Sequence, residues 1–129
     1  VTGGRKLNQP GYFLEPTVFD GVTPDMNIAQ QEVFGPVLSV LKFSDDEEAL
    51  RIANGTDYGL VAGVFTADLD RATKAAQKLR AGQIYVNEWY AGGVETPFGG
   101  FGKSGIGREK GREALFNYVQ TKNIGIALG

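Results

Sequence analysis

Two residue types that carry much of enzyme chemistry are missing from this sequence, because its 129 residues include no cysteine and no histidine. Without cysteine the chain forms no disulfide and offers no thiolate nucleophile, and nothing in it indicates an oxidising compartment. Without histidine, imidazole metal sites and a Ser-His-Asp triad are also excluded. We therefore predict no metal site and no self-contained nucleophilic site.

Long apolar runs and an excess of either charge are missing as well. No apolar stretch approaches the roughly 20 residues that span a bilayer, and residues 1–11 lack the apolar core of a signal peptide. The 13 basic and 15 acidic residues give a net charge of −2, and the basic residues are scattered. Because no basic stripe would displace counterions, we expect no nucleic-acid and no membrane partner. With no cysteine and no signal peptide, we expect a cytoplasmic location.

What is present fits one globular domain. The hydrophobic share is 42% and the charged share 22%, as in ordinary soluble proteins. Glycine is abundant, with 19 residues, and many of them lie between Gly92 and Gly111. That concentration predicts a long loop with unusual backbone angles.

Strand patterns and helix patterns alternate in the middle of the chain. Apolar segments at residues 37–43 and 60–65 predict buried strands, the first of them buried on both faces, and residues 84–86 predict a third strand. An amphipathic helix is predicted in each interval. This order indicates an α/β fold, a βαβαβ unit with a parallel sheet and right-handed crossovers.

Residues that typically start or stop helices mark the ends of the two predicted helices. Ser44 and Glu47 have the spacing of a capping box, and Asn54-Gly55 supplies a left-handed stop. The second helix is expected to begin near Asp68 and to end at Gly82.

Less regular segments flank this unit. A proline within residues 11–22 predicts an edge or irregular strand there, and residues 26–32 predict a short helical turn. After the last strand comes the glycine-rich loop, and residues 108–117 then predict a C-terminal helix. Residues 118–128 alternate at their end, which predicts a protruding β-strand whose partner comes from elsewhere.

Two glycine motifs suggest nucleotide binding, and both fail. Gly100 to Gly105 satisfies G-x-G-x-x-G, but the nearest predicted strand ends a dozen residues earlier and no acidic residue follows Glu113 to hold a ribose. Residues 102–104 resemble the end of a P-loop, but Pro97 occupies the place of its first glycine and has no N–H for a phosphate. We interpret both as a tightly folded loop.

Four groups of short motifs follow one another along the chain. They are G-Y-F and E-P-T-V at residues 11–18, E-V-F-G-P at 32–36, Y-G-L and V-F-T at 58–66, and N with T-P-F-G-G-x-x-K-S-G-x-G-R-E at 87–109. Together they resemble the aldehyde dehydrogenase family over essentially the whole chain. The resemblance implies that residues 1–117 are the C-terminal part of a catalytic domain and residues 118–129 an oligomerisation strand.

The same resemblance implies a cofactor site in the E-V-F-G-P segment. Glu32 corresponds to the glutamate that holds the nicotinamide ribose, where one carboxylate accepts from two vicinal hydroxyls. Phe34 is expected beside the nicotinamide of NAD or NADP, a cofactor bound mainly by an N-terminal domain that this chain does not include. Judged by residue type alone, Glu32 is a solvated acid and Phe34 a core aromatic.

The glycine-rich loop corresponds, by the same resemblance, to the wall of the aldehyde tunnel. Phe98 matches an aromatic residue that lines the tunnel, and Trp89 and Tyr90 stand where residues shape the substrate site. The alternative for these rings is a structural role, covering the sheet edge. Gly92 and Gly93 stand where some relatives have an aromatic residue, which leaves the preferred aldehyde open.

The charged residues of this loop are expected to be structural. Glu88 and Glu95 are interpreted as exposed acids, although acids here would also suit a cationic aldehyde. Lys103, Arg108 and Glu109 are expected to anchor the loop, not to catalyse.

The family's reaction needs parts that this chain lacks. In it a cysteine thiolate attacks the aldehyde, hydride passes to the nicotinamide, and water activated by a glutamate releases the acid. We therefore expect a fragment of an NAD(P)-dependent enzyme, inactive alone, whose partners are an aldehyde substrate, the remainder of its own polypeptide, and further copies in a homo-oligomer joined through residues 118–128. The alternative is a stand-alone, non-catalytic interaction module of the same fold.

Overall fold

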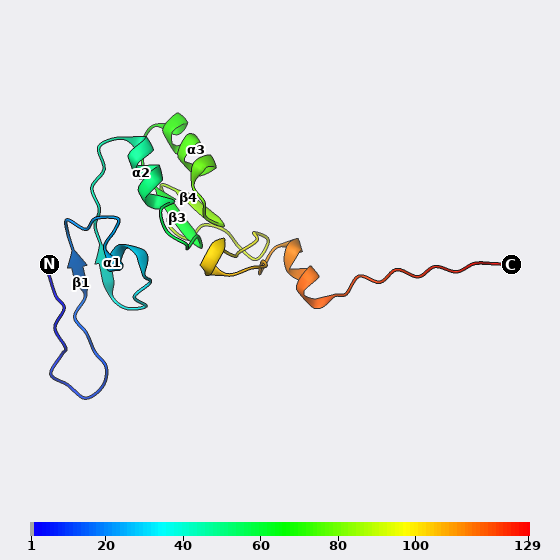
Figure 1. Ribbon diagram of the computed structural model, residues 1–129, viewed down its shortest axis with the longest axis horizontal. Helices are drawn as coiled ribbons and strands as arrows, with labels where there is room; N and C mark the ends of the chain where they lie inside the picture. The colour runs from blue at the N-terminus through cyan, green and yellow to red at the C-terminus, as the bar shows by residue number, and fades with distance from the viewer. Residues whose placement is uncertain (1) are drawn as a thin grey trace. The chain divides into compact units, whose positions relative to one another are not determined.

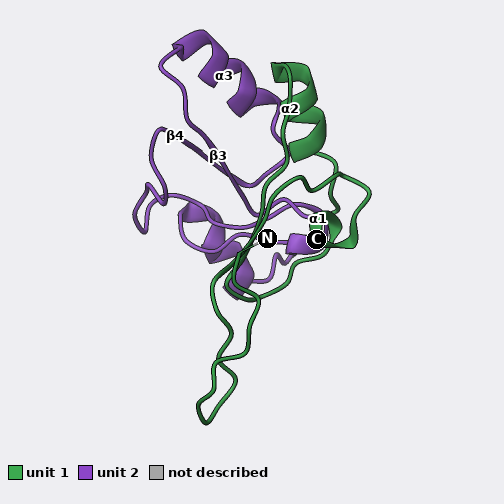
Figure 2. Cartoon of the chain, turned by 90° about the vertical axis from the view of Figure 1, so that its left-hand side faces the viewer, with its two compact units in different colours: residues 1–57 green, residues 58–129 purple. Residues whose placement is uncertain are grey.

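The computed structural model describes residues 2–129, and its internal contacts divide the chain into two compact units (Figure 2). Unit 1 ends at Asp57 and unit 2 begins at Tyr58. Each unit contains one two-stranded parallel sheet.

Unit 1 pairs strand β1 (Thr17–Phe19) in parallel with strand β2 (Val37–Ser39), and the short helix α1 (Asn27–Gln30) lies between them in sequence (Figure 1). The predicted irregular strand and helical turn are thus confirmed, with Pro16 directly before β1. Two isolated antiparallel bridges fold the N-terminal segment into a hairpin, Thr2 with Val18 and Lys6 with Leu14.

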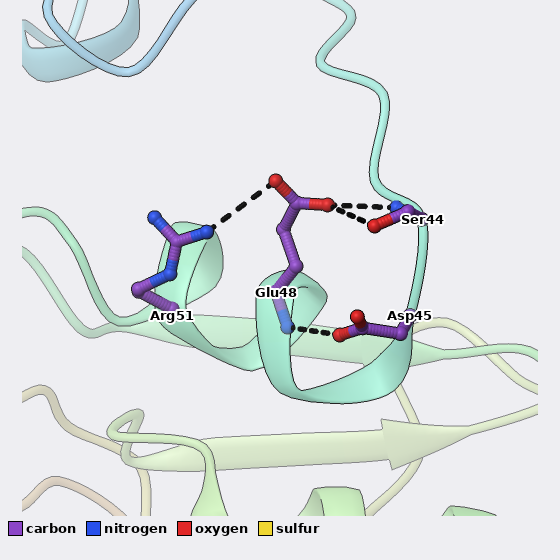
Figure 3. Close-up of polar contacts among 4 residues, drawn as sticks. All are labelled: Ser44, Asp45, Glu48 and Arg51. Carbon is purple, nitrogen blue, oxygen red and sulfur yellow. Dashed lines mark hydrogen bonds and ion pairs between the residues drawn. The ribbon is translucent and has the colours of Figure 1, made fainter.

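Helix α2 (Asp46–Ala53) has its capping box one residue later than predicted. Asp45 is the N-cap in place of Ser44, and its carboxylate accepts from the Glu48 backbone N–H at 2.8 Å. Glu48 reaches back in place of Glu47, and its Oε2 accepts from the Ser44 N–H at 2.8 Å and the Ser44 hydroxyl at 2.7 Å (Figure 3). Asp and Ser are comparable N-caps, and capping at Asp45 leaves the Ser44 hydroxyl available for this additional bond.

Helix α2 ends without the left-handed stop that was expected. Asn54 has right-handed angles, φ −87° and ψ −1°, and Gly55 does not have a positive φ. A Cβ at Gly55 would lie 3.0 Å from the Arg51 carbonyl oxygen and 3.2 Å from that of Ile52. Glycine is therefore favoured at this position by close packing and not by its φ angle.

Unit 2 is a single β-α-β unit followed by loops. Strands β3 (Val61–Val64) and β4 (Gln83–Val86) are parallel, and helix α3 (Leu69–Lys78) connects them and packs on both (Figure 1). Ala72 of the helix and Tyr85 of β4 are buried in this contact layer. This unit matches the prediction closely, because its apolar strands and its amphipathic helix have unambiguous periods.

Helix α3 begins where predicted but ends earlier. The Asp68 carboxylate accepts from the Arg71 backbone N–H at 3.0 Å, which makes Asp68 the N-cap. At the other end Leu79 is already extended, with ψ 131°. Gly82 is therefore not the helix stop. It allows a close approach of the Gly99 backbone, since a side chain at Gly82 would overlap the Gly99 carbonyl oxygen.

The α/β class with parallel strands is confirmed, whereas the strands are divided between two sheets and not joined in one. β2 pairs with β1, and β3 with β4. The Thr17 N–H donates to the Pro36 carbonyl and the Val40 N–H to the Phe19 carbonyl, both at 2.8 Å. An apolar pattern identifies a strand but not its neighbour, because backbone donors and acceptors are the same in every strand.

The C-terminal segment differs from the prediction in two ways. The helix expected at residues 108–117 is a 3-10 helix, η2 (Arg112–Tyr118), which follows a shorter one, η1 (Gly102–Ser104). Residues 119–129 are exposed and form no strand (Figure 1). A strand requires a hydrogen-bonded partner, and residues 2–129 provide none for this segment.

Few side chains of the described residues are buried. The hydrophobic ones are Val22, Ala72 and Tyr85. The expected burial of residues 37–43 on both faces is not found, since Leu38 is 59% and Phe43 60% exposed. No helix within residues 2–129 is long and apolar enough to cross a membrane.

Candidate functional site

Glu32 lies directly after helix α1, in the segment that leads to β2. The helix ends as the Gln31 N–H donates to the Asn27 carbonyl at 2.9 Å, and the chain then turns extended. Glu32 is exposed, and no group within residues 2–129 forms a hydrogen bond or ion pair with its carboxylate. Both carboxylate oxygens are thus available as acceptors.

Phe34 lies in a strained turn that presents its ring to solvent. Its φ is +53°, in the left-handed region that non-glycine residues rarely adopt, and the residue is 91% exposed. Such a conformation costs on the order of 1–3 kcal/mol and persists only where neighbouring structure enforces it. Here the Val37 N–H donates to the Gly35 carbonyl at 2.7 Å, and the Pro36 carbonyl accepts from Thr17 of β1.

Together Glu32 and Phe34 offer a free carboxylate and an exposed aromatic face two residues apart. A carboxylate with both oxygens free accepts from a vicinal diol, and a flat apolar face suits a planar ring. The residues therefore fit a nicotinamide riboside, the group implied by the sequence motif.

Asn87, at the end of β4, begins the segment of unit 2 that carries the other candidate residues. It adopts a left-handed φ of +56°, and its side-chain amide pairs twice with the backbone of Thr66. Asn87 Nδ2 donates to the Thr66 carbonyl and Oδ1 accepts from the Thr66 N–H, both at 2.8 Å. Asn87 therefore fastens the end of β4 to the segment after β3, a role that its motif position alone did not reveal.

The glycine-rich loop is anchored to the sheet at several points. Gln83 of β4 donates from Nε2 to the Pro97 carbonyl at 2.6 Å. The Gly59 N–H donates to the Ser104 hydroxyl oxygen at 3.0 Å, and the Gly59 carbonyl accepts from the Phe101 N–H at 2.9 Å. Ser104 thus serves the fold, which agrees with rejecting a phosphate loop here.

Arg108 anchors the loop, as expected. One guanidinium nitrogen donates to the Gly100 carbonyl at 3.0 Å and to the Gly107 carbonyl at 2.6 Å. The guanidinium also lies 5.4 Å from the centre of the Phe101 ring. Arg108 therefore ties two backbone carbonyls of the loop together through Nη1.

Phe98 and Tyr90 are brought together around Lys110. The Lys110 Nζ lies 5.4 Å from the centre of the Tyr90 ring and 5.6 Å from that of Phe98, and 3.5 Å from the Tyr90 hydroxyl. Phe98 is held by a backbone bridge to Glu109, with both hydrogen bonds at 2.7 Å. Lys110 was missed by sequence reasoning, because an isolated lysine after a conserved-looking motif gives no signal of its surroundings.

Trp89 makes its ring contacts with residues of strands β3 and β4. Its ring meets Tyr85 of β4 edge to face, with centroids 6.0 Å apart. It also covers Gly63 of β3, where an added Cβ would lie 2.9 Å from the indole. These contacts give Trp89 a structural role at the sheet, and the residue is nevertheless 63% exposed.

The resolved pKa shifts lie outside the candidate site. The Thr23 hydroxyl, which donates at 2.6 Å, lowers the pKa of Asp25, and the Ser44 hydroxyl lowers that of Glu48. Within residues 2–129 no group of three or more metal-binding side chains is found.

Comparison with protein families gives one match over nearly the whole chain. The model described as "Aldehyde dehydrogenase family" matches residues 1–124. An aldehyde dehydrogenase of Emericella nidulans is 48% identical over 129 residues, which are 100% of this chain and 26% of that protein. A betaine aldehyde dehydrogenase of Cereibacter sphaeroides is 49% identical over 129 residues, 100% of this chain and 27% of that protein.

Solved structures agree with these relatives. An indole-3-acetaldehyde dehydrogenase of P. syringae, determined with NAD+ and IAA, is 50% identical and superposes with a TM-score of 0.92 over 99% of this chain and 26% of its own. An NAD-dependent aldehyde dehydrogenase from Sinorhizobium meliloti is 44% identical, with a TM-score of 0.91, over 100% of this chain and 26% of its own. The chain thus spans about a quarter of the length of the relatives that it matches.

Proposed function

Because this chain belongs to the aldehyde dehydrogenase family, we propose that it supplies one part of an enzyme that oxidises an aldehyde to a carboxylic acid with NAD or NADP. The chain contains no cysteine. The thiolate nucleophile and most of the dinucleotide site therefore come from the remainder of the polypeptide. We call the chain together with these parts the assembled enzyme.

Glu32 holds the nicotinamide ribose in this proposal. Its exposed carboxylate, without a partner in residues 2–129, is the observation that carries the assignment. A carboxylate that accepts from both ribose hydroxyls fixes the position of the adjacent ring, and the exposed face of Phe34 borders that ring. Bound nicotinamide supplies the hydride acceptor, and these residues orient it.

Phe98 and Tyr90 line the approach of the aldehyde, and Trp89 supports that wall from the sheet. The loop that carries them is fastened by Ser104 and Arg108. A substrate is oriented well only by a wall that does not move, because a small displacement of the reacting carbon lowers the rate strongly. The structural anchoring supports a positioning role for the loop and no role in bond making.

The C-terminal tail, residues 119–129, joins this chain to further copies in the homo-oligomer. Residues 119–129 are extended in part and exposed, and Ile124, Ile126 and Leu128 would share one face of a strand. An unpaired strand is a template for pairing with another chain. We place the assembled homo-oligomer in the cytoplasm, in keeping with a chain that has no disulfide-forming residues.

Glu32→Gln in the assembled enzyme tests this proposal. The amide keeps the size but removes the charge, and hydrogen bonds to a charged group are worth about 1.5–3 kcal/mol. We expect the dissociation constant for NAD+, or for NADP+ where that is the preferred cofactor, to rise about tenfold or more by calorimetric titration. Glu113→Gln, a second exposed acid, should leave it unchanged. An unaltered constant in Glu32→Gln would remove the ribose assignment.

A further inference from the structure

Lys110 is placed between two rings of the substrate wall. Its ammonium lies 5.4 Å from the Tyr90 ring centre and 5.6 Å from the Phe98 ring centre. A cation over aromatic faces is attracted by their negative charge density. Its one hydrogen-bond partner in the described chain is the Tyr90 hydroxyl, at 3.5 Å.

The backbone holds Lys110 in this position from both sides. Before it, Glu109 exchanges two hydrogen bonds of 2.7 Å with Phe98. After it, the Gly111 N–H donates to the Val94 carbonyl at 2.8 Å. Lys110 itself has a left-handed φ of +57°, a conformation that a lysine adopts only where its neighbours enforce it. The loop therefore fixes the backbone of Lys110, and the Tyr90 and Phe98 rings lie next to its ammonium.

The charge of Lys110 is not neutralised by the protein. No carboxylate within residues 2–129 lies within ion-pair distance of its Nζ, and the three acids of the loop, Glu88, Glu95 and Glu109, are exposed. Lys110 is half-buried, so water screens its charge less than that of a surface lysine. The Lys110 ammonium thus leaves an uncompensated positive charge beside the Tyr90 and Phe98 rings, and this charge would repel a second cation.

We propose that Lys110 determines substrate charge, so that the enzyme prefers aldehydes whose far end carries a carboxylate and rejects aldehydes with a quaternary ammonium. This inference rests on the proposed function, in which Phe98 and Tyr90 border the path of the aldehyde. Lys110 reaches the far end of the substrate, where it pairs with an anion and takes the place over the rings that a cationic substrate would occupy. It takes no part in the reaction at the carbonyl.

Three aldehydes of similar length test the proposal in the assembled enzyme: 4-oxobutanoate, pentanal and 4-(trimethylammonio)butanal. In the wild type we expect kcat/KM to fall in that order. Lys110→Met should lower kcat/KM for 4-oxobutanoate about tenfold, mainly through KM, raise it several-fold for the cationic aldehyde, and leave pentanal nearly unchanged. Lys110→Arg should keep the wild-type order. Lys74→Met, which removes an exposed lysine of α3, should change none of the three.

Salt provides a second readout that needs no variant. The wild-type preference for 4-oxobutanoate over pentanal should shrink as sodium chloride is raised, because an ionic contribution is screened and an apolar one is not. Equal effects of Lys110→Met on all three aldehydes, or a salt-independent preference, would overturn the inference and leave the proposed function intact. Absence of turnover of every aldehyde by the wild type would instead overturn the proposed function, and this inference with it.

Discussion

At the scale of single residues, backbone strain marks the candidate site. Within residues 2–129 the non-glycine residues with positive φ are Phe34, Asn87, Tyr90 and Lys110. All of them lie in the two segments that carry candidate site residues, one in each unit, and none lies in a regular element. Asparagine tolerates this region through its short polar side chain, whereas Phe, Tyr and Lys rarely adopt it. The sequence motifs named Phe34 and Tyr90 as candidate site residues but carried no sign of their unusual backbone geometry.

The structural roles of individual glycines could also be predicted only in part from the sequence. The sequence showed that glycines are concentrated in one loop, but not which backbone each of them lets approach. Gly82 is the clearest case, because the expected helix stop is in fact a contact with Gly99. A close approach between residues distant in sequence leaves no local pattern.

Gly82→Ala should destabilise the assembled enzyme by about 1–3 kcal/mol, because the methyl group overlaps the Gly99 carbonyl oxygen and the backbone has to shift. Urea denaturation measures the loss. Gly125→Ala is the matched control, since no atom lies within 4 Å of a Cβ built there. Equal midpoints for the two variants would show that Gly82 is not a packing constraint.

At the scale of elements, the regular spacing of apolar residues predicted helices and strands well, whereas capping motifs predicted the helix ends less accurately. Helix α3 begins at the predicted Asp68, whereas the capping box of α2 lies one residue later than predicted. Two neighbouring residues, Ser44 and Asp45, are both good N-caps, and spacing alone does not choose between them. The order of strands and helices was predicted correctly as far as β4, but not in the C-terminal segment. The pairing of β2 with β1 was not predicted, because pairing depends on chain geometry between the strands.

Glu48 makes the α2 cap sensitive to acid. The Ser44 hydroxyl and, after it, the Ser44 backbone N–H lower the pKa of Glu48 from its ordinary value of 4.5. The folded state therefore binds this proton more weakly than the unfolded state, so the contribution is fully present above pH 4.5 and is lost as pH falls through the lowered pKa.

Glu48→Gln should lower the urea midpoint of the assembled enzyme at neutral pH, and the difference from wild type should shrink as the pH is taken below 4.5. Glu113→Gln, which removes the charge of an exposed acid in η2, serves as the control. A difference between wild type and Glu48→Gln that is constant with pH would contradict the role given to this carboxylate.

At the scale of the whole molecule, the chain exposes apolar surface that a folded protein normally covers. Phe34, Val94, Ile106 and Leu128 are each more than four-fifths exposed, in line with a chain that spans about a quarter of its relatives. From the sequence we expected a fragment, because the family's cysteine is missing, and a terminal segment that needs a partner. The sequence could not say which side chains would be left exposed, since that depends on surfaces supplied by other segments.

The purified chain alone is expected to self-associate through its tail. Ile126 is 77% exposed in the segment predicted to form a strand. Ile126→Lys should shift size-exclusion chromatography towards the monomer, because a charge on the pairing face opposes edge-to-edge contact. Ala127→Lys adds the same charge to the opposite face and should have a smaller effect. A wild-type chain that elutes as a monomer at all concentrations would refute this expectation.

In our proposal this chain orients a cofactor and a substrate but contributes no nucleophile. The direct test is to assay purified residues 1–129 with propanal and NAD+ or NADP+, alone and again when joined to the segments that supply a cysteine and a dinucleotide-binding domain. We expect no formation of reduced cofactor by the chain alone and sustained formation by the joined protein. Turnover by the chain alone would contradict the proposal.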